Sequence, residues 1–296
     1  MKTSLYLILS CLLLSLSACE KAVLDEEPEQ PVEGGITLQL HINHDEPAPF
    51  NGSAATDKGA AGIRSLCQWL SLGIFQDGKR IKSIHQNSGD ADFGKFSVSL
   101  PEGTYEYVAI AYNGTGKATL TSPEKITFVD NKCSDTFYHY GTLSLSASES
   151  RAISLKRAVA MVQFTVKDAI PAEVRQMKFF YTGGSSTFNA VSGYGCVNSR
   201  QTQIFELGED RRAAGTTFNL YTFPHSEQDA LKITVTAIGA EGSELTQEVF
   251  EDVPVERNYI TRTGATLFGG SSEEAGDLTF IIDADGQWGG HIDHSY

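Results

Sequence analysis

Short runs in which apolar and polar residues alternate recur along most of the chain, and they constrain the fold more than any other feature. Residues 36–43, ITLQLHIN, place Ile36, Leu38, Leu40 and Ile42 on one face and polar side chains on the other. Successive side chains of a β-strand point to opposite faces, so this spacing predicts a half-buried strand. Similar runs, separated by turns rich in glycine and aspartate, continue to residue 283. The pattern predicts an all-β protein made of antiparallel β-sandwiches.

Turn signals between these runs predict hairpins and divide the chain. Asp77-Gly78, residues 101–103 and residues 239–242 each separate two runs, as tight turns do. Residues 45–62 are small and polar and predict a long loop, and helical periodicity is limited to a short turn at residues 171–176. Residues 147–157 form a seam between two sets of strands. We therefore predict two tandem sandwich domains, residues 36–150 and 151–296.

Charge and cysteine content narrow the class of protein. The 296-residue chain carries 23 Lys and Arg against 37 Asp and Glu, a net charge of −14, which argues against binding nucleic acid or an anionic membrane by charge. Cys67, Cys133 and Cys196 are too few and too irregularly spaced for a disulfide framework or a zinc site. They are expected to be small buried hydrophobic residues, with a Cys67–Cys133 bridge left open.

The first 18 residues predict a lipoprotein signal peptide. Lys2 precedes an apolar run from Leu5 to Leu16, which has the length of a signal-peptide core and is too short to span a bilayer. Leu16-Ser17-Ala18-Cys19 resembles a bacterial lipobox, in which the cysteine thiol is acylated, with palmitate as one such chain, and becomes the new N-terminus. The alternative is an ordinary secretory cleavage near Ala18. Two or three acyl chains anchor a protein firmly, where one chain is marginal. We therefore predict lipid attachment at Cys19.

Residues 19–35 predict an extended tether. The segment has six acidic residues, Pro28, Pro31 and a Gly34-Gly35 end, so it buries little apolar surface. An acidic run after the lipid-bearing cysteine also resembles the surface-export signal of Bacteroidetes lipoproteins. Export signal and plain spacer both remain open.

No metal, cofactor or catalytic site is predicted. His41 and His44 are three apart in a strand and point to opposite faces, so with Asp45 and Glu46 they are expected to be surface residues. Residues 291–294, HIDH, are at most a weak chelator, and residues 283–287, DADGQ, lack the later ligands of a calcium loop. Residues 181–186, YTGGSS, predict a tight turn rather than a phosphate cradle, and Ser185 and Ser186 lack a nucleophile elbow. The chain is not expected to be an enzyme.

One long stretch resembles a known family. Residues 156–201 contain the sequence Arg157-Ala158-Val159-Ala160, which leads into a predicted strand at 162–166. They also contain Pro171 and the turns YTGGSSTFN and GYG. In these features the stretch resembles the core of the FimB/Mfa family of fimbrial anchor lipoproteins from Bacteroidales. The N-terminal part resembles the family more loosely, through the lipobox and the strand pair LPEGTYEYVAIAYNG at residues 100–114.

The resemblance implies a fold and a role. The fold would be two transthyretin-like β-sandwiches, and the role would be a structural subunit of a cell-surface fimbria. We predict a basal anchor, lipid-anchored at the outer membrane and surface-exposed, whose partners are the fimbrial stalk subunits (fimbrillins). The alternative is a surface glycan-binding lipoprotein of the same construction, which needs exposed aromatic residues. Its candidate residues are Trp69, Tyr138, Tyr140, Tyr194 and Trp288.

Two further expectations concern assembly. Strand exchange between subunits uses an extended segment with alternating apolar residues, and Leu278, Phe280 and Ile282 fit that description. The favoured alternative is that this last strand completes its own sandwich. In the stalk proteins that the chain resembles, cleavage after an arginine removes the first strand. Cleavage after Arg64, the first arginine here, would separate the body from Cys19 unless the two pieces stayed paired. An anchor is therefore expected to keep Arg64 uncut.

Overall fold

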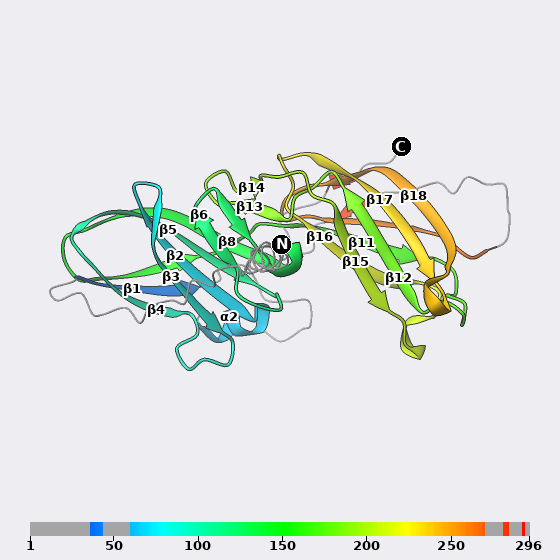
Figure 1. The fold of residues 1–296 in the computed structure, drawn as a ribbon, viewed down its shortest axis with the longest axis horizontal. Helices are drawn as coiled ribbons and strands as arrows, with labels where there is room; N and C mark the ends of the chain where they lie inside the picture. Colours follow the sequence, from blue (N-terminus) through cyan, green and yellow to red (C-terminus); the bar gives the residue numbers. More distant parts are fainter. Residues whose placement is uncertain (1–35, 44–59, 270–280, 284–291, 294–296) are drawn as a thin grey trace, which may run out of the picture. The chain divides into compact units, whose positions relative to one another are not determined.

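The computed structural model describes residues 36–43, 60–269, 281–283 and 292–293, all of which belong to one compact unit, Gly34–Tyr296. Strands dominate this part of the chain (Figure 1). The predicted all-β sandwich fold is confirmed. No helix among the described residues is long and apolar enough to cross a membrane.

The N-terminal lobe consists of two facing sheets. In the smaller sheet β1 (Ile36–Asn43) lies between β4 (Lys95–Leu100), its antiparallel partner, and β9 (Glu149–Ser154), its parallel partner. The larger sheet has the order β10-β8-β5-β2-β3. Its strands are β10 (Lys156–Arg157), β8 (Thr136–Leu145), β5 (Gly103–Tyr112), β2 (Trp69–Gln76) and β3 (Lys79–Asn87).

The C-terminal lobe repeats this plan. One sheet has the order β16-β11-β19-β20-β21: β16 (Thr216–Thr222), β11 (Ala160–Val166), β19 (Ile260–Ala265), β20 (Ile281–Asp283) and β21 (Ile292–Asp293). The facing sheet has the order β15-β12-β17-β18: β15 (Gln201–Glu206), β12 (Gln176–Thr182), β17 (Asp229–Ile238) and β18 (Glu244–Val255).

The two lobes share one connectivity, which makes them a tandem repeat of the same sandwich. In each, the first strand pairs antiparallel with one neighbour and parallel with the last main strand of its lobe: β1 with β4 and β9, and β11 with β16 and β19. The alternation of apolar and polar residues does not predict these two parallel pairs, because it sets which face a side chain occupies and not which strand lies beside it.

A small sheet joins strands from both parts of the chain. It has the order β14-β13-β7-β6, with β6 (Thr119–Ser122), β7 (Lys125–Thr127), β13 (Thr187–Asn189) and β14 (Tyr194–Gly195). Pairing of β13 with β7 places Phe188 opposite Ile126. This four-strand joint, as we call it, pairs residues that are 60 and 62 positions apart in the sequence.

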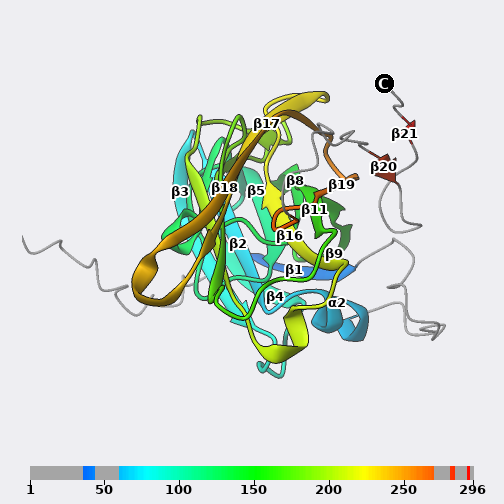
Figure 2. The same ribbon diagram turned by 90° about the vertical axis from the view of Figure 1, so that its right-hand side faces the viewer.

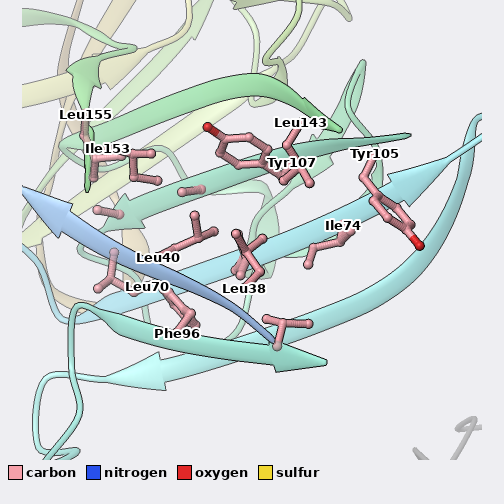
Figure 3. Packing of buried hydrophobic residues seen from close by; sticks show 14 of the residues in the cluster. Leu38, Leu40, Leu70, Ile74, Phe96, Tyr105, Tyr107, Leu143, Ile153 and Leu155 are labelled. Carbon is pink, nitrogen blue, oxygen red and sulfur yellow. The ribbon is translucent and has the colours of Figure 1, made fainter. Parts of the chain in front are cut away.

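Three buried clusters form the core. The first fills the N-terminal sandwich, where Leu38 and Leu40 of β1 point between the sheets toward Leu70 and Tyr107 (Figure 3). The second fills the C-terminal sandwich around Phe164. The third contains residues of both lobes and of the four-strand joint, among them Val108, Ile110, Tyr138, Met161, Phe188, Phe223 and Ile260. The core is therefore continuous across the seam.

The main difference from expectation is α2 (Ala60–Leu66), where a loop was predicted up to residue 62 and a strand from residue 65. Ile63 of the helix and Cys67, the residue after its end, are both buried, and the Cys67 amide donates to the Ile63 carbonyl oxygen (3.1 Å). This face of the segment therefore packs on the first cluster. α2 contacts β1 (Figure 2). Apart from α2, the described residues contain three single-turn 3₁₀ helices: Val129–Asn131, Glu209–Arg211 and Ala240–Gly242.

Most predicted strands and hairpins are present. β1 has the predicted bounds, and the β2–β3 hairpin turns at Asp77 and Gly78, whose φ angles of 51° and 73° suit a two-residue hairpin turn. The predicted boundary at 150/151 lies inside β9, and residues 149–154 and 156–157 pair with strands of the N-terminal lobe. The division into domains at that point stays a prediction.

Candidate functional site

Three features of the structure are candidates for a functional role. They are β1, which is the strand that follows the tether, the four-strand joint, and a groove beside that joint. Cys19 lies outside the described residues, and its lipidation stays a prediction. The strand that the tether leads into is β1. It has six paired positions with β4 and six with β9, and Leu38 and Leu40 are fully buried. Hydrogen bonds therefore hold β1 on both of its edges.

Arg64 is held in place by the turn between β3 and β4. Its guanidinium donates to the carbonyl oxygen of Ser88, to that of Asp90 (2.7 Å) and to that of Ala91 (3.1 Å). The same group lies 5.3 Å from the centre of the Phe93 ring. The first arginine of the chain is thus engaged by backbone acceptors on another segment.

The predicted exchange strand is described only at its end. Leu278 and Phe280 lie outside the described residues. Ile282 belongs to β20, which pairs antiparallel with β19 of its own lobe and places Ile282 opposite Thr261. Whether this strand is ever exchanged stays a prediction.

The residues that carry the family resemblance build the four-strand joint. Gly193 has a φ of 79°, and a Cβ there would collide with the Tyr138 hydroxyl and the Arg257 guanidinium. A Cβ on Gly195 would collide with the Ser185 side chain and with backbone. The GYG turn therefore needs both glycines for close approach.

Ser185 and Ser186 have structural roles in this joint. The Ser185 hydroxyl donates to the carbonyl oxygen of Thr187 (2.7 Å) and accepts from the amides of Thr187 (3.1 Å) and Val197 (3.2 Å). Ser186 bonds to Ser199 through its amide and its hydroxyl. Both serines are buried, and their hydrogen bonds bind one turn to another.

A buried ion pair lies at the seam. Arg157 donates to both carboxylate oxygens of Asp135 (2.8 and 3.1 Å) and to the Asn258 side-chain oxygen (3.2 Å), and it lies 4.6 Å from the Phe137 ring centre. The Arg157 side chain is 4% exposed. The sequence does not indicate that Arg157 and Asp135 pair, because 22 positions separate them.

Each described aromatic residue of the proposed glycan platform packs on, or bonds to, a neighbouring residue of the protein. Tyr138 is buried and packs on Phe188, with ring centres 4.7 Å apart. Tyr194 lies under the Arg257 guanidinium, 4.7 Å away. Tyr140 donates to the Glu106 carboxylate, a bond that raises the pKa of Tyr140 to about 12. Trp69 packs against the third cluster, and Trp288 lies outside the described residues.

Most of the remaining candidates for metal binding or catalysis lie outside the described residues. His41 lies in β1, whereas His44, Asp45, Glu46, His291 and His294 lie outside the described residues. Of residues 283–287, the structure describes Asp283 at the end of β20. Within the described part of the chain, no three His, Cys, Asp or Glu residues are grouped to hold a metal ion.

All three described cysteines are free thiols. Cys67 is buried, Cys133 is half-buried and Cys196 is exposed. The prediction that the cysteines are buried therefore fits Cys67 best. Burial raises the pKa of the Cys67 and Cys133 thiols to about 12. These two thiols are therefore protonated at neutral pH.

A groove of about 480 Å³ opens beside the four-strand joint, and we call it the edge-strand groove. Its walls come from β15 and β16, which are edge strands of facing sheets, and from two loops of the N-terminal lobe. Its residues are Tyr112, Asn113, Gly114, Thr115, Gly116, Phe128, Val129, Lys132, Cys133, Ser134, Asp135, Gln203, Phe205, Asn219 and Tyr221. No sequence motif marks this set, since its members lie on five separate segments.

Comparison with solved structures finds similar chains at low identity. A structure described as candidate polysaccharide-binding proteins (DUF1812) from Bacteroides thetaiotaomicron is 12% identical, with a TM-score of 0.50, and the match covers 87% of this chain and 98% of that one. A candidate adhesin from Bacteroides ovatus is 14% identical, with a TM-score of 0.47 and coverage of 80% and 87%. The fimbrial anchor protein Mfa2 from Porphyromonas gingivalis is 12% identical, with a TM-score of 0.43 and coverage of 84% and 95%.

At 12% identity the Bacteroides thetaiotaomicron match is a similarity of fold alone, and it confirms the expected architecture over most of the chain. No protein with a curated description matches the sequence. A family model does match, over residues 29–292. The chain therefore belongs to DUF6562, a family of unknown function.

Proposed function

We propose that this protein is a non-enzymatic structural subunit of a cell-surface fimbria, and that it is the basal anchor. Lipid on Cys19 holds it at the outer membrane, and its body binds the first stalk subunit. The observation that carries this proposal is the position of β1. The strand that follows the tether is the central strand of its sheet and is buried on its apolar face.

The physical argument concerns tension. An anchor transmits pull from the filament, through its body, to the lipid. Pull on the tether reaches the body at Ile36 and is resisted by the pairings of β1 with β4 and β9. Burial of Leu38 and Leu40 adds about 2 kcal/mol for each side chain. A subunit whose first strand were removable would lose this connection. The sequence resemblance to fimbrial anchor lipoproteins supports the same role.

Replacing the lipid-bearing cysteine tests the tether. We expect Cys19→Ala to move the protein from the membrane fraction to the medium and to abolish labelling with a fatty acid, because no thiol remains to be acylated. Cys11→Ala is the matched control, since Cys11 lies in the same leader and is removed with it. Membrane retention of Cys19→Ala would contradict the proposal.

The same two variants test the anchor role. With Cys19→Ala, we expect intact filaments to be shed into the medium while their length is unchanged, as measured by electron microscopy. A glycan-binding lipoprotein without a role in fimbriae would leave the filaments attached. Filaments that stay on cells while the protein itself is released would overturn the anchor assignment.

A further inference from the structure

We propose that the edge-strand groove is a binding site for an uncharged oligosaccharide. This inference goes beyond anchoring, because the groove lies in the folded body and its chemistry does not depend on the lipid. At about 480 Å³ the groove lies within the range of small-molecule sites, roughly 300–1,000 Å³.

Aromatic rings form part of the wall and are fixed in place. The Tyr112 hydroxyl donates to the carbonyl oxygen of Gly116 (3.0 Å), and the Phe128 ring packs edge-on to Tyr112 at 5.2 Å. Phe205 packs on Phe179 (5.7 Å) and Phe218 (5.1 Å). Tyr112 and Phe128 are buried, 1% and 7% exposed, so they support the wall from behind. Half-buried Phe205 and Tyr221 are the lining rings left to meet the apolar face of a sugar.

Tyr221 adds a hydroxyl to the same wall. It is half-buried, and burial raises its pKa to about 12, so the hydroxyl is neutral and can both donate and accept. Its own carbonyl oxygen accepts from the Tyr181 hydroxyl (3.0 Å), which holds the backbone of β16 in place. Tyr221 is thus held in the wall of the groove.

Two side-chain amides stand on the facing edge strands. Gln203 of β15 makes no side-chain hydrogen bond with the described part of the chain, and the Asn219 oxygen of β16 accepts one from Gln163 (3.4 Å). An amide offers both donors and an acceptor, as neighbouring sugar hydroxyls do. The pair therefore suits a ligand rich in hydroxyl groups.

The groove offers little unpaired charge with which to bind a strongly acidic or basic ligand. Asp135 is already neutralised by its two bonds to Arg157, which leaves Lys132 as the one charged lining residue without an ion partner among the described residues. Val129 is the one large aliphatic side chain of the lining set. An extended peptide would need several apolar pockets for its alternate side chains, so a neutral sugar fits better.

The test uses the full-length Cys19→Ala protein, purified from the medium, on a printed array of neutral glucose, galactose, mannose and N-acetylglucosamine oligosaccharides. We expect binding to at least one of these classes. Gln203→Ala and Asn219→Ala should each weaken it about tenfold, the loss for one hydrogen bond of about 1.4 kcal/mol. Tyr221→Phe should weaken it by removing the hydroxyl while keeping the ring.

Ile204→Ala and Thr217→Ala are the matched controls, because they are exposed neighbours on the same two strands and do not line the groove. Both should bind as the parent does. Thermal unfolding of every variant separates lost binding from lost folding. Absence of binding to any neutral glycan, binding unaffected by the groove variants, or binding only to a peptide library would each overturn the proposal. The anchor proposal would stand in all three cases, because filament shedding measures the lipid and not the groove.

Discussion

Arg157 shows how much one residue at the seam depends on its partner. Its guanidinium is almost fully buried and makes a two-pronged pair with Asp135, which is 21% exposed. Removing one member of a buried pair leaves the other charge poorly solvated, at a cost of about 3–5 kcal/mol. We expect Asp135→Ala to lower the free energy of unfolding by about 3 kcal/mol, measured by urea denaturation.

A second ion pair in the same protein supplies the control. Lys232 and Glu251 also lie at bonding distance, 2.5 Å, but their side chains are 53% and 59% exposed. Exposed pairs contribute about 0–1 kcal/mol, so Glu251→Ala should have little effect. Equal losses of unfolding free energy in Asp135→Ala and Glu251→Ala would show that burial does not make the Arg157–Asp135 pair more stabilising.

At the scale of elements, α2 and β1 determine whether the tether can be cut from the body. Arg64 lies within α2, and its side chain is held by three carbonyl oxygens, so it is poorly placed to enter a protease. We expect an arginine-specific protease to leave the Arg64–Ser65 bond intact in the native protein, as read by mass spectrometry. With trypsin, we expect the Arg64→Lys variant to be cut at this bond faster than the parent protein. The lysine ammonium lacks the planar donor geometry with which the Arg64 guanidinium binds the three carbonyl oxygens.

Arg200 is the internal control for that digestion. It is exposed and lies between β14 and β15, outside any helix or strand. It should be cut well before Arg64. A mature N-terminus at Ser65 in protein from native outer membranes would instead identify a stalk or tip subunit.

At the scale of the whole molecule, the third cluster decides whether the lobes unfold together. Phe188 packs on Tyr138 of the N-terminal lobe and on Phe223 (ring centres 5.0 Å apart), and β13 pairs with β7. We expect a single calorimetric transition for the parent protein. Phe188→Ala should cost about 3–5 kcal/mol and split the transition in two, because it opens a cavity in the shared cluster.

Phe164→Ala is the comparison, since Phe164 belongs to the cluster confined to the C-terminal sandwich. We expect Phe164→Ala to lower the free energy of unfolding by a similar amount while the protein still unfolds in a single calorimetric transition. Two transitions in the parent protein would mean that the lobes unfold independently, as separate tandem domains do.

The sequence by itself determined the local structure of this protein. Alternation predicted β1 with its bounds, and turn residues predicted the hairpins β2–β3 and β17–β18, because strand periodicity and turn chemistry act over a few neighbouring residues. The same alternation predicted antiparallel β-sandwiches, and the resemblance to fimbrial anchor lipoproteins implied that they are transthyretin-like. Lipidation of Cys19 and exchange of Leu278, Phe280 and Ile282 remain predictions.

Only the tertiary structure decided which segments meet. The parallel β1–β9 pair, the four-strand joint, the Asp135–Arg157 pair and the edge-strand groove each join segments distant in sequence. The strands of the joint are two to four residues long, too short to show a period, and they are stabilised by the partner strand and by shared burial. Long-range pairing is a property of the assembled core, so no local pattern in the sequence encodes it alone.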